Sequence, residues 1–229
     1  MINEINKNNG STTLEFRKAL AAKTFSTTAY YDSLISNWFH RNTNEPINKF
    51  STSAELSSIL RYGENPHQSA SLYKSSMQQS GIPHAKLLQG KELSYNNIND
   101  SDAALQLIRE FDKDSPSVAI IKHANPCGVA SGATLCEAYT KAFSCDTTSA
   151  FGGIVALNQK IDQDTANEIV KIFTEVIIAP DVSDDAKEIF KSKSNLRVLV
   201  LSSLHKQNTS HNYKSCLLYT SPSPRDRQK

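Results

Sequence analysis

Short apolar runs that alternate with helical stretches between residues 117 and 201 place the strongest constraint on the fold. Strand-like runs lie at 117–122, 154–157, 176–178 and 196–201, and helical periodicity lies at 134–143, 165–173 and 184–190. Strands and helices in alternation are typical of a parallel sheet with right-handed crossovers. The unbroken apolar character of the runs fits a sheet that is covered on both faces. The sequence therefore predicts an α/β fold with a mainly parallel sheet.

The chain divides into three unequal parts, at 1–45, 46–201 and 202–229. The first part is helical but has too few apolar residues for a core of its own. The second part holds the strands and helices of the α/β pattern. The last part loses the apolar periodicity and resembles translated adaptor sequence from Cys216 onward. We therefore expect 202–229 to be a disordered or foreign tail.

Two further helices are predicted ahead of the first buried strand. One covers 12–39, where Thr12 and Glu15 have the spacing of a capping box. A linker at 41–49 follows it, because this segment combines a proline with several asparagines. The other helix covers 101–111 and is capped by Asp100 or its neighbour Asn99.

Composition excludes several classes of protein. The 25 Lys and Arg against 23 Asp and Glu leave a net charge of +2, which favours neither nucleic acid nor a membrane surface as a partner. No apolar stretch reaches the length of a membrane span. The four cysteines show no C-x-x-C spacing, and the polar N-terminus does not resemble a signal segment. These features predict a reduced, cytoplasmic protein.

The most informative motif for function is the pair Lys122 and His123, which follows the apolar run 118–121. Strand ends in α/β sheets are common ligand sites, since the backbone is fixed there while side chains face a crevice. The following Pro126-Cys-Gly128 predicts a turn that ends the extended chain. A basic pair after a strand is also common as a structural or solvated feature.

Four other clusters are candidates for binding. Arg61-Tyr-Gly-Glu-Asn-Pro-His-Gln68 could grip a planar anion or be a solvated turn. Lys91-Glu-Leu-Ser-Tyr-Asn-Asn97 is more typical of a structural turn. Ser149-Ala-Phe-Gly-Gly153 permits close backbone approach to a ligand, although a tight turn is almost as good an explanation. Glu175 precedes a buried strand, where an unpaired charge is costly, so we expect it to have a partner from protein or substrate.

In this order, the motifs at 61–68, 91–97, 122–128 and 148–156 resemble those of the bacterial AICAR transformylase/IMP cyclohydrolase family. The resemblance runs from about residue 13 to 201. It implies that 13–39 is the end of the cyclohydrolase domain and that 46–201 is the first transformylase subdomain. That subdomain would be three-layered and cytidine-deaminase-like. Most of the cyclohydrolase domain and the second half of the transformylase are missing.

The resemblance also implies an activity and its residues. The family transfers a formyl group from 10-formyltetrahydrofolate to AICAR and then closes formyl-AICAR to IMP, as a homodimer. Lys122 and His123 match its catalytic residues, and the AICAR-binding set is Arg61, Tyr62, His123, Gly152 and Glu175. A catalytically inactive fragment that only binds nucleotide or forms dimers is the alternative.

The cytidine-deaminase resemblance raises the question of a metal. Zinc deaminases carry H-x-E followed by P-C-x-x-C. Here Asn125 stands where the glutamate is needed, and Ala130 stands where the second cysteine is needed. We therefore expect no catalytic zinc. Schiff-base chemistry at Lys122 is a further alternative, but no recognisable phosphate loop of a cofactor accompanies it.

Overall fold

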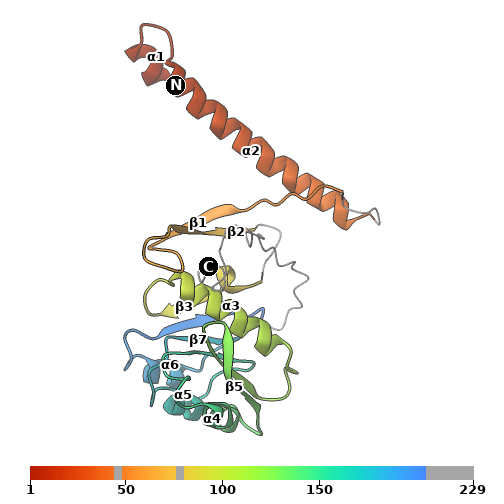
Figure 1. The fold of residues 1–229 in the computed structure, drawn as a ribbon, viewed down its shortest axis with the longest axis vertical. Helices are drawn as coiled ribbons and strands as arrows, with labels where there is room; N and C mark the ends of the chain where they lie inside the picture. The colour runs from red at the N-terminus through yellow and green to blue at the C-terminus, as the bar shows by residue number, and fades with distance from the viewer. Residues whose placement is uncertain (44–47, 76–79, 205–229) are drawn as a thin grey trace, which may run out of the picture.

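A computed structural model describes residues 1–43, 48–75 and 80–204 of the chain. A helical arm stands apart from an α/β body, and a β-hairpin lies between them (Figure 1). Of the predicted tail at 202–229, only residues 202–204 belong to the described part of the chain. The predicted boundary at residues 45 and 46 also lies outside the described residues.

The arm consists of α1 (Ile2–Lys7) and α2 (Leu14–Arg41). The N-cap of α2 is Thr13, whose hydroxyl accepts from the Phe16 amide at 3.2 Å, so the expected capping pair of Thr12 and Glu15 is wrong by one residue. Of the side chains of α2, only Ser33 is buried. Within the described residues, no helix combines the length and the apolar character needed to cross a bilayer.

The main sheet has six strands in the order β3-β8-β7-β6-β4-β5. The sequence pattern identified four of these strands within a residue or two of their ends. The bounds are β3 (Lys86–Gln89), β4 (Ser117–Lys122), β5 (Asn125–Ser131), β6 (Ile154–Leu157), β7 (Val176–Ala179) and β8 (Arg197–Val200).

The expectation of a mainly parallel sheet is wrong, because the sheet is mixed. Strands β6, β7 and β8 run parallel, but β4 is antiparallel to both β5 and β6, and β3 is antiparallel to β8. The physical reason is that the chain reverses directly after Lys122, and β5 returns beside β4 as a hairpin. The residues Pro126-Cys-Gly128, expected to form a turn, lie inside β5.

Gly128 explains why β5 can lie where it does. A Cβ on this residue would fall 1.9 Å from the Ala142 carbonyl oxygen, so the helix above β5 leaves room only for a hydrogen atom. Glycine is needed here for close approach of helix and strand rather than for a turn.

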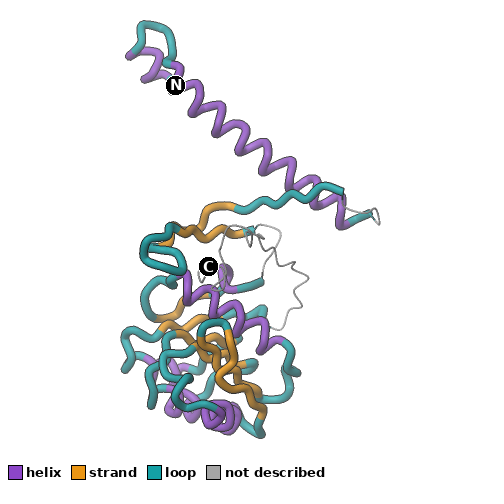
Figure 2. The backbone as a smooth tube through the Cα atoms, viewed as in Figure 1, coloured by secondary structure: helices purple, strands orange, loops and turns teal. Residues whose placement is uncertain are grey.

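Helices cover both faces of the sheet, which gives three layers (Figure 2). One face carries α3 (Tyr95–Arg109), and the other carries α4 (Leu135–Cys145), α5 (Gln163–Ile169) and α6 (Asp184–Phe190). The start of α3 precedes the predicted helix by six residues. Its cap is Ser94 in a capping box with Asn97, so the expected cap at Asn99 or Asp100 is wrong.

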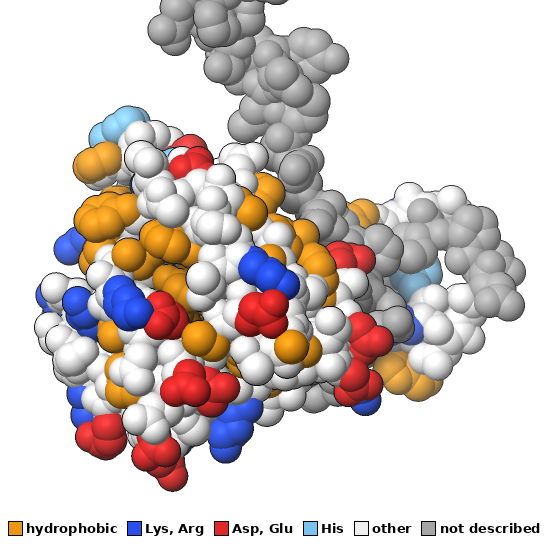
Figure 3. Space-filling view, turned by 90° about the horizontal axis from the view of Figure 1, so that it is seen from below, with side chains coloured by type: hydrophobic (Ala, Val, Ile, Leu, Met, Phe, Trp, Pro, Cys, Tyr) orange, Lys and Arg blue, Asp and Glu red, His pale blue; other side chains and the backbone are white. Residues whose placement is uncertain are grey.

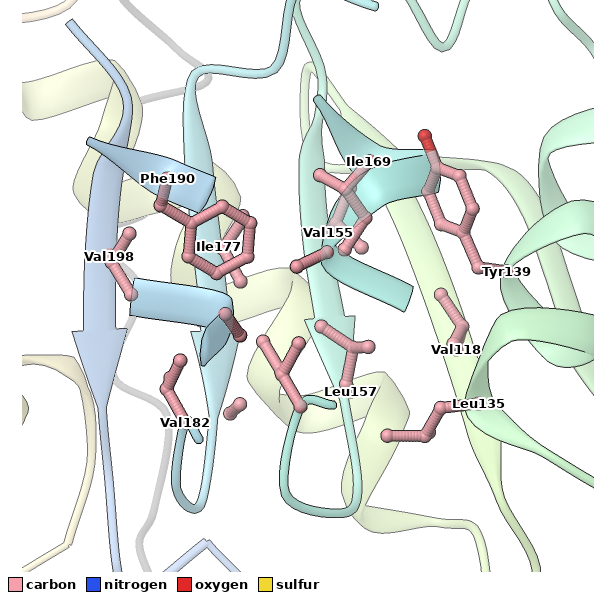
Figure 4. Packing of buried hydrophobic residues seen from close by; sticks show 14 of the residues in the cluster. Val118, Leu135, Tyr139, Val155, Leu157, Ile169, Ile177, Val182, Phe190 and Val198 are labelled. Carbon is pink, nitrogen blue, oxygen red and sulfur yellow. The ribbon is translucent and has the colours of Figure 1, made fainter. Parts of the chain in front are cut away.

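Each face has its own apolar cluster. Under α4–α6, Tyr139, Ile169 and Phe190 pack on Val155 and Ile177 of the sheet (Figure 4). Under α3, the helix residues Leu105 and Ile108 pack with strand residues of the opposite face. The alternation of faces along each strand explains why the strands are apolar throughout.

The described chain remains packed to its last residue, Leu204. This side chain is fully buried in the cluster under α3, and its carbonyl oxygen accepts from Arg109 Nε at 2.7 Å. Residues 202–204, which were expected to begin the tail, therefore follow the body of the fold.

The hairpin between arm and body is formed by β1 (Glu55–Leu60) and β2 (Ala70–Lys74), which pair antiparallel. The 3-10 helix η1 (Ile82–His84) connects it to the main sheet. On the end of the body seen in Figure 3, acidic and basic side chains are interspersed. Such mixing agrees with the small net charge of the chain.

A matched pair of phenylalanines tests the packing. Phe190 is 1% exposed under the sheet, whereas Phe25 on α2 is 75% exposed. We expect Phe190→Ala to lower the free energy of unfolding by about 3–5 kcal/mol, through lost transfer energy and a cavity. Phe25→Ala should change it by less than about 0.5 kcal/mol. Urea unfolding followed by circular dichroism measures both, and equal effects would contradict this packing.

Candidate functional site

Lys122 joins two of the predicted motifs. Strand β4 pairs antiparallel with β6 so that Ile121 faces Ile154, which places the end of β4 beside the start of β6. The Lys122 Nζ donates to the Phe151 carbonyl oxygen at 2.8 Å. The lysine that follows the buried strand is thereby brought against the glycine-containing loop that precedes the next one.

His123 and Ala124 form the two-residue turn of the β4–β5 hairpin. Both have positive φ, +51° and +56°, in the left-handed region that residues other than glycine seldom adopt. Such a pair is the mark of a tight hairpin turn that normally carries Asn-Gly. The Asp100 carboxylate accepts from both backbone amides at 3.0 Å, and the Asn125 side-chain amide donates to the His123 carbonyl at 2.7 Å.

Glu175 lies on the other side of the Gly152–Gly153 loop. Its amide donates to the Gly153 carbonyl at 3.0 Å, just before β7 begins. Its carboxylate accepts from Asn97 Nδ2 at 2.6 Å, so the expected partner is present and comes from the protein. Gly152 has φ +73°, and a Cβ there would lie 3.5 Å from the Phe173 ring.

Arg61 and Tyr62 follow β1 and interact with each other. The guanidinium carbon lies 5.0 Å from the centre of the tyrosine ring, within reach of a cation–π interaction. The loop that they begin is tied to the body by Asn96, which donates to the Glu64 carbonyl at 3.4 Å. Both side chains remain available to a ligand, because Arg61 is exposed and Tyr62 is half-buried.

A pocket of about 1170 Å³ lies between the hairpin and the body. Its walls include Arg61, Tyr62, Asn97, Phe173 and Glu175. This volume exceeds the usual range of about 300–1000 Å³ for small-molecule sites. The pocket therefore brings together the predicted binding residues of the hairpin loop and of the sheet.

Lys122, His123 and Gly152 do not line this pocket but adjoin it. The link is Phe173, a wall residue whose ring centre lies 5.5 Å from that of Phe151. The Gly152 amide also donates to the Phe173 carbonyl at 2.8 Å. The predicted residues thus form two groups, one at the Lys122 turn and the Gly152 loop and one in the pocket, which are connected through Phe151 and Phe173.

Helix α3 supplies three residues that are not among the predicted site residues. Asn96, Asn97 and Asp100 hold, respectively, the Arg61 loop, Glu175 and the His123 turn. Their spacing puts them on successive turns near the start of one helix. Their sequence signal is the run of amides and acids at 94–102, a pattern that predicts a structural turn at 91–97 and a helix cap at 99 or 100.

Charge around Lys122 affects a neighbouring thiol. Burial raises the pKa of Cys127, the Asp146 carboxylate raises it further, and the Lys122 ammonium opposes both. Asp146 itself accepts from the amides of Thr148 and Ser149, and the Ser149 hydrogen bonds are the main cause that lowers the Asp146 pKa.

Among the described residues, no three His, Cys, Asp or Glu side chains are grouped so that they could hold a metal ion.

Comparison with known proteins identifies the family. A family model described as AICARFT/IMPCHase bienzyme matches residues 1–225. The chain belongs to this bienzyme family. It is 56% identical over 207 residues to the bifunctional purine biosynthesis protein PurH of Brucella anthropi, which covers 89% of the chain and 38% of that relative. The PurH protein of a Ruegeria species is 53% identical over 206 residues, covering 89% of the chain and 39% of the relative.

Membership in the bienzyme family confirms the resemblance drawn from the four motifs. The chain spans about two fifths of the length of these relatives. It thus represents a piece of the bienzyme sequence that contains the Lys122 and His123 turn, the Gly152 loop and the Arg61 loop.

The pKa of the Cys127 thiol can be used to detect the charges near Lys122. Asp146→Asn removes the carboxylate charge but keeps an oxygen for the turn, so we expect the raised pKa of Cys127 to fall toward its usual value. The pH dependence of alkylation by iodoacetamide, read at the Cys127 peptide by mass spectrometry, measures this pKa. Asp114→Asn, in an exposed loop, is the control and should leave it unchanged. A Cys127 pKa that is unchanged in Asp146→Asn would show that the Asp146 charge does not act on the thiol.

Proposed function

We propose that this chain supplies the first half of a formyltransferase site of purine biosynthesis. The amine nitrogen of AICAR bonds to the formyl carbon of 10-formyltetrahydrofolate, and the bond from that carbon to folate N10 breaks. The amine loses a proton and N10 gains one, which yields formyl-AICAR and tetrahydrofolate. The observation that carries the proposal is the 2.8 Å hydrogen bond from Lys122 Nζ to Phe151, because it unites the basic pair with the glycine loop.

Proton transfer and stabilisation of the oxyanion are the tasks assigned to His123 and Lys122. The amine of AICAR is a poor nucleophile, since its lone pair is delocalised into the imidazole carboxamide. A positioned group that takes the amine proton as the new bond forms lowers this barrier. His123 contacts the amine and moves its proton, while Lys122 provides a cation near the oxyanion that develops on the formyl group.

Binding of AICAR is the task assigned to the remaining residues. The planar guanidinium of Arg61 suits the phosphate because its N–H groups can donate two parallel hydrogen bonds. The Tyr62 ring lies against this guanidinium. Glu175, held by Asn97, accepts from the exocyclic amide or amine. The loop at Gly152 allows the backbone to approach the planar base. The large pocket between hairpin and body supports this division of roles.

The rest of the relatives' length would complete the enzyme. We assign to it a second cytidine-deaminase-like subdomain with further AICAR and folate contacts, and the domain that closes formyl-AICAR to IMP. The described body would be the first such subdomain, working without catalytic zinc because Asn125 and Ala130 replace motif residues of the zinc deaminases. The complete enzyme would be a cytoplasmic homodimer.

The catalytic assignment can be tested in a complete enzyme. This enzyme joins the chain to the segments of the Brucella anthropi relative that lie outside the match. Lys122→Ala and His123→Ala should each lower kcat for formyl transfer by about 10²–10⁴-fold, as expected for a positioned acid or base. The controls are Lys141→Ala, at an exposed position on α4, and His40→Ala, near the end of the helical arm. Turnover near that of the parent in both site variants, with folding intact, would refute the assignment.

The 229-residue chain alone should perform neither reaction. Its site lacks the second subdomain, so the bound geometry on which proximity catalysis depends is incomplete. Residues 1–45 are too few for a cyclohydrolase site with its own core. Assays of tetrahydrofolate release and of IMP formation measure both activities, and calorimetric titration with AICAR tests the alternative of a binding fragment. Formyl transfer by this chain at ordinary enzyme rates would contradict the expectation.

A further inference from the structure

We propose that Asp100 is a positioning residue that holds the His123 imidazole in the geometry needed for proton transfer. The inference rests on the proposed function and adds to it a residue that does not touch substrate. Two observations support it: the strained conformation of the turn, and the way in which Asp100 binds that turn. A third observation, the place of Asp100 on α3, explains why the Asp100 carboxylate stays in position.

The turn at His123 and Ala124 is not favoured by its own sequence. Both residues have positive φ, and neither is glycine or asparagine, the residues that adopt this region readily. Ala124 is exposed, so packing of its methyl group does not hold it in place. A strained pair of this kind persists only when surrounding structure determines it, and such pairs cluster at functional sites.

Asp100 is the surrounding residue that holds this turn in its strained conformation. Its two carboxylate oxygens accept separately from the His123 and Ala124 amides, both at 3.0 Å. Hydrogen bonds to an ionised acceptor are stronger than neutral ones. Because both successive amides converge on one carboxylate, the peptide plane between the two residues is fixed. The direction of the His123 Cα–Cβ bond, from which the imidazole extends, is fixed with it.

The place of Asp100 on α3 extends the effect to the rest of the site. The same helix holds Glu175 through Asn97 at 2.6 Å. Helix α3 also packs on the sheet through Leu105 and Ile108, which are fully buried. One rigid helix therefore holds both the proton-transfer turn after β4 and the Glu175 carboxylate just before β7.

The test uses the complete enzyme defined above. Asp100→Asn keeps the size of the side chain but leaves one oxygen acceptor, and Asp100→Ala removes both. We expect kcat to fall by about 10-fold in the first and up to about 100-fold in the second, as for a displaced catalytic group. KM for AICAR should change less than kcat. The matched control is Asp114→Asn, which should leave both constants unchanged.

A second substitution separates positioning from a general loss of structure. Glycine adopts positive φ without steric cost, so Ala124→Gly should let the turn form without the carboxylate. We expect Asp100→Ala with Ala124→Gly to recover most of the lost kcat. Ala133→Gly, an exposed alanine outside the positive-φ set, is the control and should give no recovery.

Hydrogen exchange gives a readout that does not depend on activity. In the complete enzyme, the peptide that contains His123 and Ala124 should exchange faster in Asp100→Ala, while peptides of β6 and β7 remain protected. The positioning proposal is overturned if Asp100→Ala turns over like the parent, or if Ala124→Gly gives no recovery. Failure of the proposed function is distinguished by Lys122→Ala and His123→Ala, which would then also be without effect.

Discussion

The antiparallel pairing of β4 with β6 is the interaction on which the candidate site depends. It sets the end of β4 beside the start of β6, so Lys122 reaches the Phe151 carbonyl at 2.8 Å. In an all-parallel sheet the two ends would lie at opposite edges, and the basic pair could not meet the glycine loop. The rule that ligands bind at the carboxyl ends of parallel strands therefore does not describe this site, which lies where one strand ends and two others, β6 and β7, begin.

Helix α3 is the second constraint, because it connects segments that no strand joins. Asn96, Asn97 and Asp100 contact the Arg61 loop, Glu175 and the His123 turn within its first two turns. Asn97 belongs to the buried face of the helix, which continues through Ala104 and Ile108 into the apolar cluster under α3. A helix that is rigidly packed on one face and polar near its start can hold groups from several loops in fixed positions relative to one another.

Local elements were well predicted from the sequence, and their pairing was not. The strands 117–122 and 154–157 and the helix 184–190 agree with the structure at both ends. Strand β5 was missed because Asn, Pro and Gly within it are typical of turns, and only its close contact with α4 explains the glycine. The start of α3 was missed because its first turn is polar. Family membership, by contrast, followed from four short motifs.

The sequence by itself determined the buried strands, most helices and the chemical identity of the site residues, because apolar periodicity and side-chain type are local properties. Only the tertiary structure decided the direction of β4, the meeting of Lys122 with the Gly152 loop and the capture of the His123 turn by Asp100. These depend on hydrogen bonds between residues 23 and 29 positions apart in the chain. Such bonds form only when register and helix packing bring the partners together.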